Sequence, residues 1–276
     1  MRKLAAATAM VLAITGASAL AGAEWPKAGA PGSLQWALEG SWRPEADVKR
    51  DAVRHPAEEL QFMGLKPNMT VVEIYPGGGY FTAILGPVLK EGGGKLIVVG
   101  GRDEPSKPYK ERFIDHPEIY GTLGYAALNP TSTGLGAEGS ADMVVTFRNV
   151  HNWMANNFAE KAFGDFYKVL KPGGLLGVEE HRAKAQGAQD PKAESGYVQQ
   201  AYVKELAKQA GFEFVKSSEL LANPKDTKDH PFGVWTLPPV LNSAPPGQPA
   251  DPNFDHTKYV AIGEADNMLL LFRKPK

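Results

Sequence analysis

A short segment of the chain, EIYPGGGYFT from Glu73 to Thr82, combines an acidic residue with a glycine-rich turn. Because glycine has no side chain, Gly77, Gly78 and Gly79 would let the backbone approach a bound molecule closely. The N-terminus of a following helix would add free N–H groups at the same place. The segment therefore predicts a site for a small cofactor, although such a turn also occurs without any ligand.

Residues that could act on a substrate follow another apolar run, DMVVTF. They are Asn149, His151 and Trp153 in the segment RNVHNW. Imidazole titrates near neutral pH, which makes His151 the best candidate for a general base. The alternative is structural, because an amphipathic ring at a strand end often caps the core.

Glu179, Glu180 and His181 stand together at the end of a third apolar run and raise a metal site as an alternative. Asp142 or His151 would complete the ligand set. Asp142, however, begins its strand and so lies at the opposite end of the sheet, and no H-x-x-x-H spacing is present. We therefore favour a site without a metal.

The elements that must position these residues alternate between strands and helices. Continuous apolar runs are typical of parallel strands covered on both faces, and apolar spacings of three and four indicate helices. This order predicts a doubly wound α/β fold. The expected strands span residues 70–75, 95–99, 122–128, 142–147, 175–181, 212–219 and 267–273, and the expected helices span 45–63 with a bend at His55-Pro56, 80–89, 109–115, 158–170 and 198–210.

The N-terminus has the pattern of a secretory signal peptide. Arg2 and Lys3 precede a short apolar run that ends in Ala-Gly-Ala, which predicts cleavage after Ala23. The run is too short and too rich in small residues for a membrane anchor. We therefore expect a periplasmic or secreted protein without stable membrane insertion after cleavage.

The mature chain is expected to have two parts. Residues 24–64 form an arm, irregular up to Arg43, followed by a helix, and residues 65–276 form the main domain. An insertion at 222–266 carries most of the late prolines and interrupts the last pair of strands. Long connections within a domain are often lids over a site, and we interpret this one as a lid.

Composition argues against several classes of protein. Thirty Lys and Arg against 31 Asp and Glu give a net charge of −1, which provides no electrostatic footprint for nucleic acid or an anionic membrane. The absence of cysteine excludes disulfides and thiol chemistry. The oligomeric state does not follow from the sequence.

Four segments in a fixed order carry a family resemblance: VVEIYPGGGYFT, a second strand followed by Asp103, ADMVVTFRNVHNW and FYKVLKPGGLLGVEEH. Together they resemble the class I S-adenosylmethionine-dependent methyltransferases. More narrowly, the chain is similar to a group of exported, predicted methyltransferases with PGGG, FRNVHNW, NPKDTKDHP and C-terminal FRKP segments. The resemblance implies a Rossmann-like, mostly parallel seven-stranded sheet with residues 267–273 as an antiparallel strand beside 212–219. It also implies S-adenosylmethionine as cofactor and a small molecule as methyl acceptor.

The resemblance further implies roles for single residues. Glu73 would orient the amino group of the methionine moiety, and Asp103 would hold the ribose. Gly77 and Gly79 would line the passage in which the cofactor lies close to the backbone of the turn. Asn149 and His151 would face the transferred group, and the sulfonium would lie against the rings of Tyr75, Tyr80 and Trp153.

Two positions depart from the family pattern. Tyr75 stands where the first of three glycines is usual, and its ring would narrow the methionine end of the pocket. Gly100 or Gly101 stands where an acid usually ends the second strand, so Asp103 would have to reach back.

Two further functions stay open. The first is a non-catalytic protein that binds a nucleoside or another metabolite in the pocket narrowed by Tyr75. The second is a metal-assisted or hydrolytic enzyme that uses Glu180, His181, Asp226 and His230 under the insertion. The absence of a G-x-S-x-G nucleophile elbow argues against the hydrolase.

Overall fold

Seven strands form one sheet in the order β3-β2-β1-β4-β5-β7-β6 in the computed structural model, which describes residues 24–245 and 247–276. Every pairing is parallel except those of β7, which is antiparallel to both β5 and β6. The predicted doubly wound sheet with a reversed last strand is therefore confirmed. The strands are β1 (Thr70–Ile74), β2 (Lys95–Gly100), β3 (Gly124–Ala127), β4 (Ala141–Phe147), β5 (Leu170–His181), β6 (Glu213–Ser218) and β7 (Asn267–Arg273).

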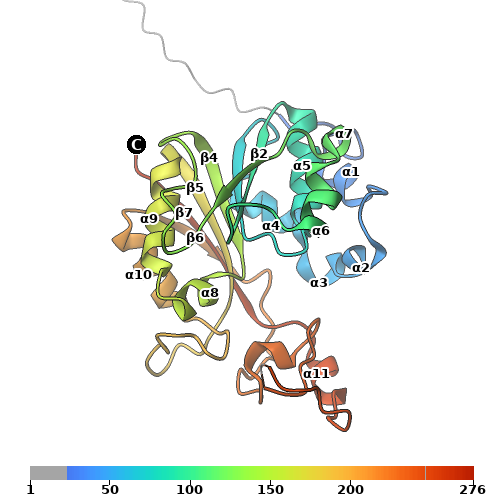
Figure 1. The fold of residues 1–276 in the computed structure, drawn as a ribbon, viewed down its shortest axis with the longest axis vertical. Helices are drawn as coiled ribbons and strands as arrows, with labels where there is room; N and C mark the ends of the chain where they lie inside the picture. The colour runs from blue at the N-terminus through green and yellow to red at the C-terminus, as the bar shows by residue number, and fades with distance from the viewer. Residues whose placement is uncertain (1–23, 246) are drawn as a thin grey trace, which may run out of the picture.

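Helices cover both faces of the sheet and make a three-layer structure (Figure 1). One apolar core lies between the sheet and α8, α9 and α10, and the other lies beneath α1, α4, α5 and the helical segment before β3. The helices are α1 (Leu34–Leu38), α2 (Glu45–Val48), α3 (Asp51–Arg54), α4 (Pro56–Met63), α5 (Thr82–Gly92), α6 (Lys107–Tyr109), the π-helical turn η1 (Lys110–Ile114), α7 (Pro117–Tyr120), α8 (Val150–Ala155), α9 (Ala159–Val169), α10 (Gln200–Gln209), the 3₁₀ turn η2 (Gly233–Thr236) and α11 (Thr257–Ile262).

Local sequence explains several of these elements, whereas α1, α7, α8 and α11 lie outside the expected helices. The predicted bend at His55-Pro56 is present, because His55 has a left-handed backbone (φ 46°) between α3 and α4. The arm expected to be irregular contains α1, which begins where the Ser33 hydroxyl accepts a hydrogen bond from the Trp36 N–H at 3.2 Å. Helix α8 was also not expected, because its six residues are too few for a clear periodic pattern.

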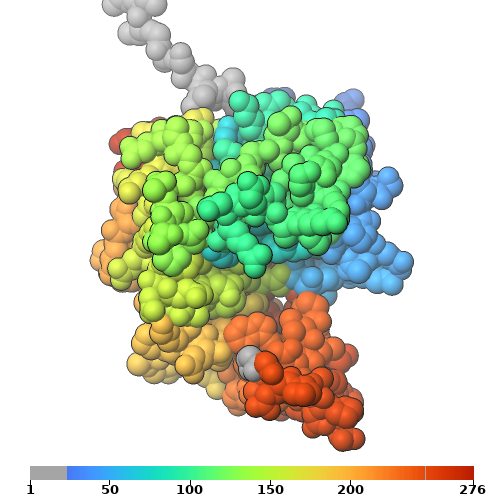
Figure 2. Space-filling model, in the orientation of Figure 1, coloured from blue at the N-terminus to red at the C-terminus, as the bar shows by residue number. Residues whose placement is uncertain are grey.

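The insertion at 222–266 forms a lobe beyond the end of the sheet at which α8 lies, visible as the orange-red part of Figures 1 and 2. Its own small apolar cluster contains Val234, Leu237 and Ala265 together with Tyr197 of the main domain. The role of a lid remains a prediction.

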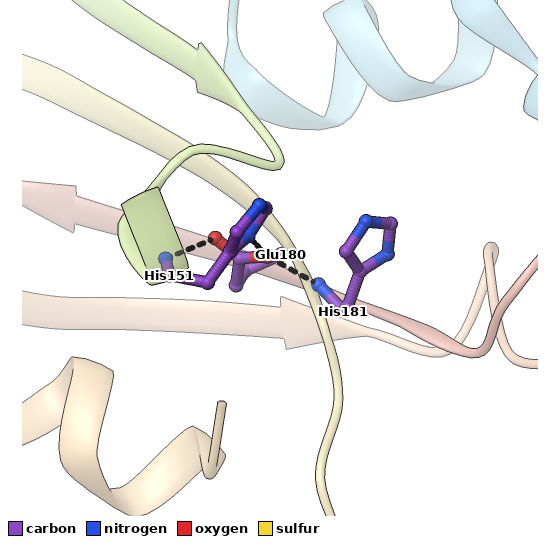
Figure 3. Close-up of side chains that lie close together, drawn as sticks. All are labelled: His151, Glu180 and His181. Carbon is purple, nitrogen blue, oxygen red and sulfur yellow. Dashed lines mark hydrogen bonds and ion pairs between the residues drawn. The ribbon is translucent and has the colours of Figure 1, made fainter. Parts of the chain in front are cut away.

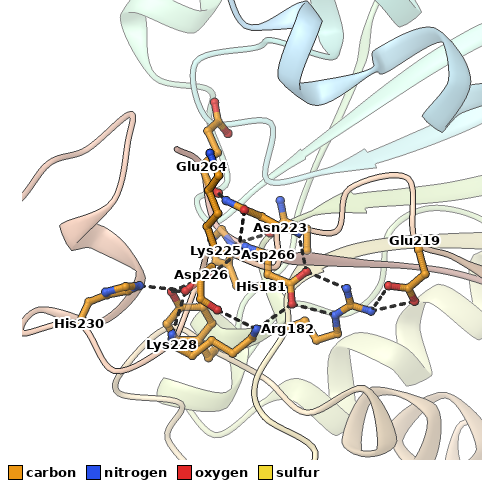
Figure 4. Close-up of polar contacts among 12 residues, drawn as sticks. His181, Arg182, Glu219, Asn223, Lys225, Asp226, Lys228, His230, Glu264 and Asp266 are labelled. Carbon is orange, nitrogen blue, oxygen red and sulfur yellow. Dashed lines mark hydrogen bonds and ion pairs between the residues drawn. The ribbon is translucent and has the colours of Figure 1, made fainter. Parts of the chain in front are cut away.

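Buried polar contacts tie the base of this lobe to the sheet (Figure 4). The Asp226 carboxylate accepts hydrogen bonds from the Tyr197 hydroxyl at 3.0 Å and from the Asp266 N–H at 2.8 Å. Arg182, just after β5, is paired with Asp266 at 2.7 Å and with Glu219 at 2.7 Å. The insertion is therefore anchored at both of its ends.

The signal peptide expected at residues 1–23 lies outside the described residues. Among residues 24–245 and 247–276, no helix has the length and hydrophobicity needed to cross a membrane.

Candidate functional site

Two cavities meet at the carboxyl ends of β1 and β4. The first, of about 390 Å³, extends toward the insertion, and the second, of about 500 Å³, extends toward the end of β2. Both are lined by Tyr75, Pro76, Gly77 and Asn149. Ligands of open α/β sheets bind at this end of the strands. The turn predicted from the sequence therefore lies between the two cavities and lines both of them.

Glu73 contributes an unusual carboxylate to the first cavity. Its side chain is only 1% exposed, and Oε2 accepts a hydrogen bond from the Thr82 hydroxyl at 2.7 Å. Oε1 is buried and has no hydrogen-bond partner. Burial raises the pKa of Glu73 to about 7, although the hydrogen bonds from Thr82 oppose this shift. The site thus presents a buried acceptor atom that lacks a donor.

The three glycines of the turn differ in their surroundings. Gly77 and Gly79 both have positive φ angles, of 57° and 84°. A Cβ atom on Gly77 or Gly78 would meet nothing within 4 Å, so their backbone is open to a ligand. A Cβ atom on Gly79 would collide with the ring of Phe113. Gly79 is therefore required by packing, whereas Gly77 and Gly78 fit the predicted cofactor passage.

Tyr75 has the backbone of the glycine that it replaces, with φ at 50°. Its hydroxyl donates a hydrogen bond to the Leu128 carbonyl, and its ring packs edge-on against Trp153 with centroids 6.0 Å apart. The hydroxyl also lies 3.2 Å from the position of a Cβ atom on Gly101, so the ring extends toward the end of β2. The left-handed conformation is rare for a tyrosine and marks a locally strained site.

The missing acid at the end of β2 has a steric explanation. A Cβ atom on Gly100 would collide with the Tyr125 hydroxyl, and one on Gly101 would lie 3.2 Å from the Tyr75 hydroxyl. Two tyrosine hydroxyls therefore occupy the space into which an acidic side chain would extend. Tyr75 and Tyr125 both line the second cavity.

His151, near the start of α8, meets Glu180 and His181 at the end of β5 (Figure 3). One potential ligand atom of each residue lies within 4.8 Å of the other two. The Glu180 carboxylate accepts hydrogen bonds from His151 Nδ1 at 2.9 Å and from the His181 N–H at 2.8 Å. His181 Nδ1 donates to Asn267 Oδ1 at 2.8 Å. Both imidazoles therefore line the first cavity with Nδ1 occupied, which leaves Nε2 as the atom that can act on a ligand.

The ionisation of this cluster is set by burial and by its internal hydrogen bonds. Burial alone would raise the pKa of Glu180, but the charge and hydrogen bond of His151 outweigh it, so that the pKa is lowered. Burial lowers the pKa of His181 to about 4, although Glu180 opposes this shift. The cluster thus contains an ionised carboxylate and a neutral His181 at neutral pH.

The sequence matches no protein-family model and no curated protein. The structure is similar to a SAM-dependent methyltransferase from Aquifex aeolicus, with a TM-score of 0.50, 17% identity and coverage of 66% of this chain and 90% of that chain. It is also similar to 1,6-didemethyltoxoflavin-N1-methyltransferase from Burkholderia thailandensis, solved with S-adenosylhomocysteine bound, with a TM-score of 0.50, 14% identity and coverage of 84% and 82%. The [4+2]-cyclase SpnF has a TM-score of 0.51, 15% identity and coverage of 86% and 85%.

The fold is that of the class I methyltransferases. At these identities the likeness shows the fold and leaves the activity open, since one fold hosts different activities.

Within the methyltransferase fold, Asn149 lines both cavities and also joins the ends of two strands. Its Nδ2 lies 3.1 Å from the Ile74 carbonyl of β1 and 3.2 Å from the Phe147 carbonyl of β4. The amide is 7% exposed. Asn149 therefore holds the two strand ends together at the place where a ligand would pass.

Trp153, predicted to hold the sulfonium, lies in the core. Its side chain is fully buried and packs against Phe163 and Phe166 as well as Tyr75, and it lines neither cavity. The structure thus favours the alternative that its ring caps the core. The aromatic residue that covers His151 is instead Trp235 of the insertion, with ring centroids 5.9 Å apart.

Asp103 is exposed and does not line the second cavity, but its neighbour Glu104 does. Both residues lie in the same loop after β2, and the sequence pattern does not distinguish them. Glu104 is therefore the carboxylate of this loop that lines the second cavity, and the ribose role of Asp103 stays a prediction.

The residues of the metal alternative separate into three groups. Asp142 is bound to Thr70 N–H and Lys171 at the opposite end of β4, as expected. Asp226 and His230 pair with each other at 2.9 Å inside the insertion and do not line the first cavity. Of the proposed ligands, His151, Glu180 and His181 come together at the site.

A group of charged residues in the first cavity does not follow from the sequence pattern. They are Arg50, Arg54, Arg112, Arg148, Glu264 and Asp47, of which Asp47 pairs with Arg112 at 3.0 Å. The only local signal is at Arg148, which follows a buried strand and has a positive φ angle of 63°. Strained non-glycine residues of this kind cluster at functional sites.

Proposed function

We propose that this protein binds S-adenosylmethionine and transfers its methyl group to a small-molecule acceptor. The observation that carries the proposal is the unpartnered Oε1 of Glu73, buried at the carboxyl end of β1 beside the open backbone of Gly77. A buried carboxylate oxygen without a donor costs about 1–3 kcal/mol. The ammonium group of the cofactor's methionine moiety is a ligand group that supplies this donor.

The other residues of the cavities fit the rest of the cofactor. Gly77 and Gly78 allow close approach of the backbone, and Glu104 and Tyr125 offer polar groups for the ribose hydroxyls in the second cavity. When bound, S-adenosylmethionine supplies an electrophilic methyl carbon on a sulfonium sulfur. The solved Burkholderia enzyme binds S-adenosylhomocysteine on the same fold, which supports the choice of cofactor.

The acceptor would enter through the first cavity, between the glycine turn and the insertion. Displacement at a methyl carbon depends mainly on alignment of the reacting atoms. His151, held by Glu180 through Nδ1, directs Nε2 to the cavity and removes a proton from an acceptor that has one to lose. Trp235 packs edge-on against His151 and limits access of water from the side of the insertion.

The test is a calorimetric titration of residues 24–276 with S-adenosylhomocysteine, which needs no acceptor. We expect binding in the micromolar range for the wild-type protein and binding at least about ten-fold weaker for Glu73→Gln, since an ammonium loses its carboxylate. Glu58→Gln, on the exposed surface of α4, is the matched control. Absence of heat up to millimolar ligand would overturn the proposal.

A second candidate, binding of a nucleoside or metabolite without methyl transfer, is favoured by the position of Tyr75 between the two cavities. If its ring blocks S-adenosylmethionine, Tyr75→Gly should raise affinity for S-adenosylhomocysteine about ten-fold or more. We expect no such gain, because the ring is already held aside by the Leu128 carbonyl. Tyr75→Phe separates the loss of that hydrogen bond from the loss of the ring.

A metal-assisted reaction is a third candidate, favoured by the proximity of His151, Glu180 and His181. Neutral imidazoles with Nδ1 bound to an oxygen acceptor are a common arrangement of metal ligands. Against it, Arg148 lies near enough to His181 to help lower its pKa, and a cationic neighbour also disfavours a metal ion. Metal analysis of the dialysed protein decides, because a stoichiometric transition metal would favour this candidate.

The expected place of action is the periplasm, which we propose from the pattern of residues 1–23. Fractionation of the cells followed by N-terminal sequencing tests this. A mature N-terminus at Glu24 in the periplasmic fraction is expected, and a cytoplasmic protein that starts at Met1 would contradict it.

A further inference from the structure

Three arginines from two distant parts of the chain converge on one carboxylate in the first cavity. Arg50 directly precedes α3, Arg54 is the last residue of α3, Arg148 follows β4, and Glu264 lies at the end of the insertion. Glu264 accepts hydrogen bonds from Arg50 Nε at 2.9 Å, Arg54 Nε at 3.3 Å and Arg148 Nη1 at 3.2 Å. We refer to Arg50, Arg54 and Arg148 as the arginine cluster.

The arginine cluster carries more positive charge than its surroundings neutralise. Glu264 supplies one carboxylate for three guanidinium groups. Glu179 lies 3.7 Å from Arg148, but burial raises its pKa to about 7, so it is only partly ionised at neutral pH. Burial also raises the pKa of the nearby Glu59 well above its ordinary value. An excess of buried positive charge is unfavourable unless an anion accompanies it.

Most hydrogen-bond donors of the arginine cluster have no acceptor among the described residues. Each guanidinium has five N–H donors, and each gives one of them to Glu264. Arg50 Nη2 is buried and lies 2.9 Å from Glu264 Oε1, but without the alignment of a hydrogen bond. The three side chains are 25%, 8% and 18% exposed, and apart from Arg50 Nη2 their remaining donors are open to water or to a ligand in the cavity.

The arginine cluster is held in place rather than free to move to solvent. The Arg54 guanidinium lies 4.8 Å from the centre of the Tyr80 ring, and that of Arg50 lies 6.0 Å from it. Arg148 is aimed at the cavity by its left-handed backbone, which costs about 1–2 kcal/mol for a residue with a side chain. Preorganised guanidinium groups of this kind are the usual partners of carboxylates and phosphates.

Glu264 occupies the position that a ligand anion would take. The carbonyl of Glu264 accepts a hydrogen bond from Asn223 Nδ2 at 2.7 Å, which fixes its backbone at the base of the insertion (Figure 4). Its side chain alone has to turn for the arginine cluster to become available. While no ligand is bound, the Glu264 carboxylate neutralises part of the positive charge of the arginine cluster.

We propose that the methyl acceptor carries an oxyanion, a carboxylate or a phosphate, which binds Arg50, Arg54 and Arg148 in place of the Glu264 side chain. The term acceptor rests on the proposed methyl transfer, whereas the anion site itself does not. The cavity then holds the acceptor by its charged group on the side of the insertion. His151 and the glycine turn lie on other walls of the same cavity.

The experiment titrates the purified protein with inorganic phosphate and, separately, with sodium benzoate at constant ionic strength. Benzamide, which has the shape of benzoate without its charge, is the ligand control. We expect one of the two anions to bind the wild-type protein and to bind Glu264→Gln about ten-fold more tightly, since the internal competitor is removed. Which anion binds more tightly distinguishes a phosphate from a carboxylate.

Two further variants test whether the arginines bind the anion and whether the higher affinity is specific to the loss of the Glu264 carboxylate. Arg54→Gln should bind the anion about ten-fold more weakly; if circular dichroism shows that it is unfolded, the more exposed Arg50→Gln replaces it. Glu219→Gln, which also removes a carboxylate from an arginine pair but lies outside the cavity, should bind like the wild-type protein. The proposal is overturned if neither anion binds wild-type or Glu264→Gln protein, or if benzamide binds as well as benzoate.

A titration in the presence of saturating S-adenosylhomocysteine separates this inference from the proposed function. Unchanged anion affinity supports an acceptor site beside the cofactor. Competition would overturn the assignment to the acceptor, because the cofactor's own carboxylate would then use the arginines. Anion binding by a protein that does not bind S-adenosylhomocysteine would support the anion site and overturn the methyl transfer.

Discussion

Glu180 lies directly behind His151, with its fully buried carboxylate 2.9 Å from Nδ1 of the imidazole. The same carboxylate accepts hydrogen bonds from the backbone N–H groups of His151 and His181, at 3.2 and 2.8 Å. Three donors on one buried carboxylate keep it ionised and fix its orientation. His151 and Glu180 therefore have the arrangement of a general base that a carboxylate orients, in which Nδ1 carries the proton and Nε2 is free to accept one.

The first prediction concerns this pair. We expect His151→Ala to lower kcat by about 10²–10⁴-fold with little change in KM, because a base acts on the transition state. Glu180→Gln should lower kcat by a smaller factor, as it weakens the orientation and loses the charge. In the His151→Ala background, Glu180→Gln should have no further effect on kcat. Additive losses would mean that Glu180 acts independently of His151; His116→Ala, on the surface, is the control.

The second prediction concerns pH and Glu73, whose folded-state pKa is raised to about 7. Because the folded protein holds the proton of Glu73 more tightly than the unfolded chain, the stability due to this group is fully present below the ordinary carboxyl pKa. It is lost as the pH rises toward 7. The unligated protein should therefore lose up to about 3 kcal/mol of stability between pH 4.5 and pH 7 through this residue. Glu73→Gln should remove this part of the slope, measured by chemical denaturation at each pH. Equal slopes for both proteins would show that Glu73 is not the group responsible.

Burial in the unligated protein favours the protonated form of Glu73. Binding of a cationic amino group should instead favour its ionised carboxylate. The affinity for S-adenosylhomocysteine should rise as pH increases through 7, because the carboxylate form is the one that pairs with an ammonium. Calorimetry in buffers of different ionisation enthalpy would detect the proton released from Glu73 on binding. No proton release in that pH range would place the ammonium elsewhere.

The third prediction compares Gly77 and Gly79, the two glycines of the turn that have positive φ angles. Gly79→Ala should lower the free energy of unfolding by about 2–4 kcal/mol, because the methyl group meets the Phe113 ring in addition to the backbone strain. Gly77→Ala should cost only about 1–2 kcal/mol, which is the strain alone. It should nevertheless weaken S-adenosylhomocysteine binding about ten-fold or more, because its methyl group enters the passage. Urea denaturation and calorimetry of both variants measure the difference; unchanged affinity in Gly77→Ala would contradict the predicted passage.

The fourth prediction compares neighbouring carboxylates after β2. Glu104→Gln should weaken binding of S-adenosylhomocysteine about ten-fold, since Glu104 lines the second cavity and a charged hydrogen bond is lost. Asp103→Asn, one residue earlier and outside the cavity, should change the affinity less than about two-fold. The opposite ranking would support Asp103 as the ribose residue.

The fold could be predicted largely from local pattern. Strands such as β1 and β4 are continuous apolar runs because both faces of a parallel sheet are buried, and α9 shows its buried face in the spacing of Ala162, Phe163 and Phe166. The glycine turn was likewise legible, because its backbone needs positive φ angles that glycine adopts readily. The short helices α1 and α8 were missed, since five or six residues make no clear period.

The sequence by itself thus determined the order of strands and helices, the turn after β1 and the chemistry available at Glu73 and His151. Only the tertiary structure decided that Trp153 points into the core, that Glu104 rather than Asp103 lines a cavity, and that Glu180 supports His151. It also decided that Arg50 and Glu264, 214 residues apart, meet in one cavity. The physical reason is that the periodicity of burial is a local property of strands and helices. The direction of a loop side chain, and the convergence of distant charges, depend instead on how those elements pack together.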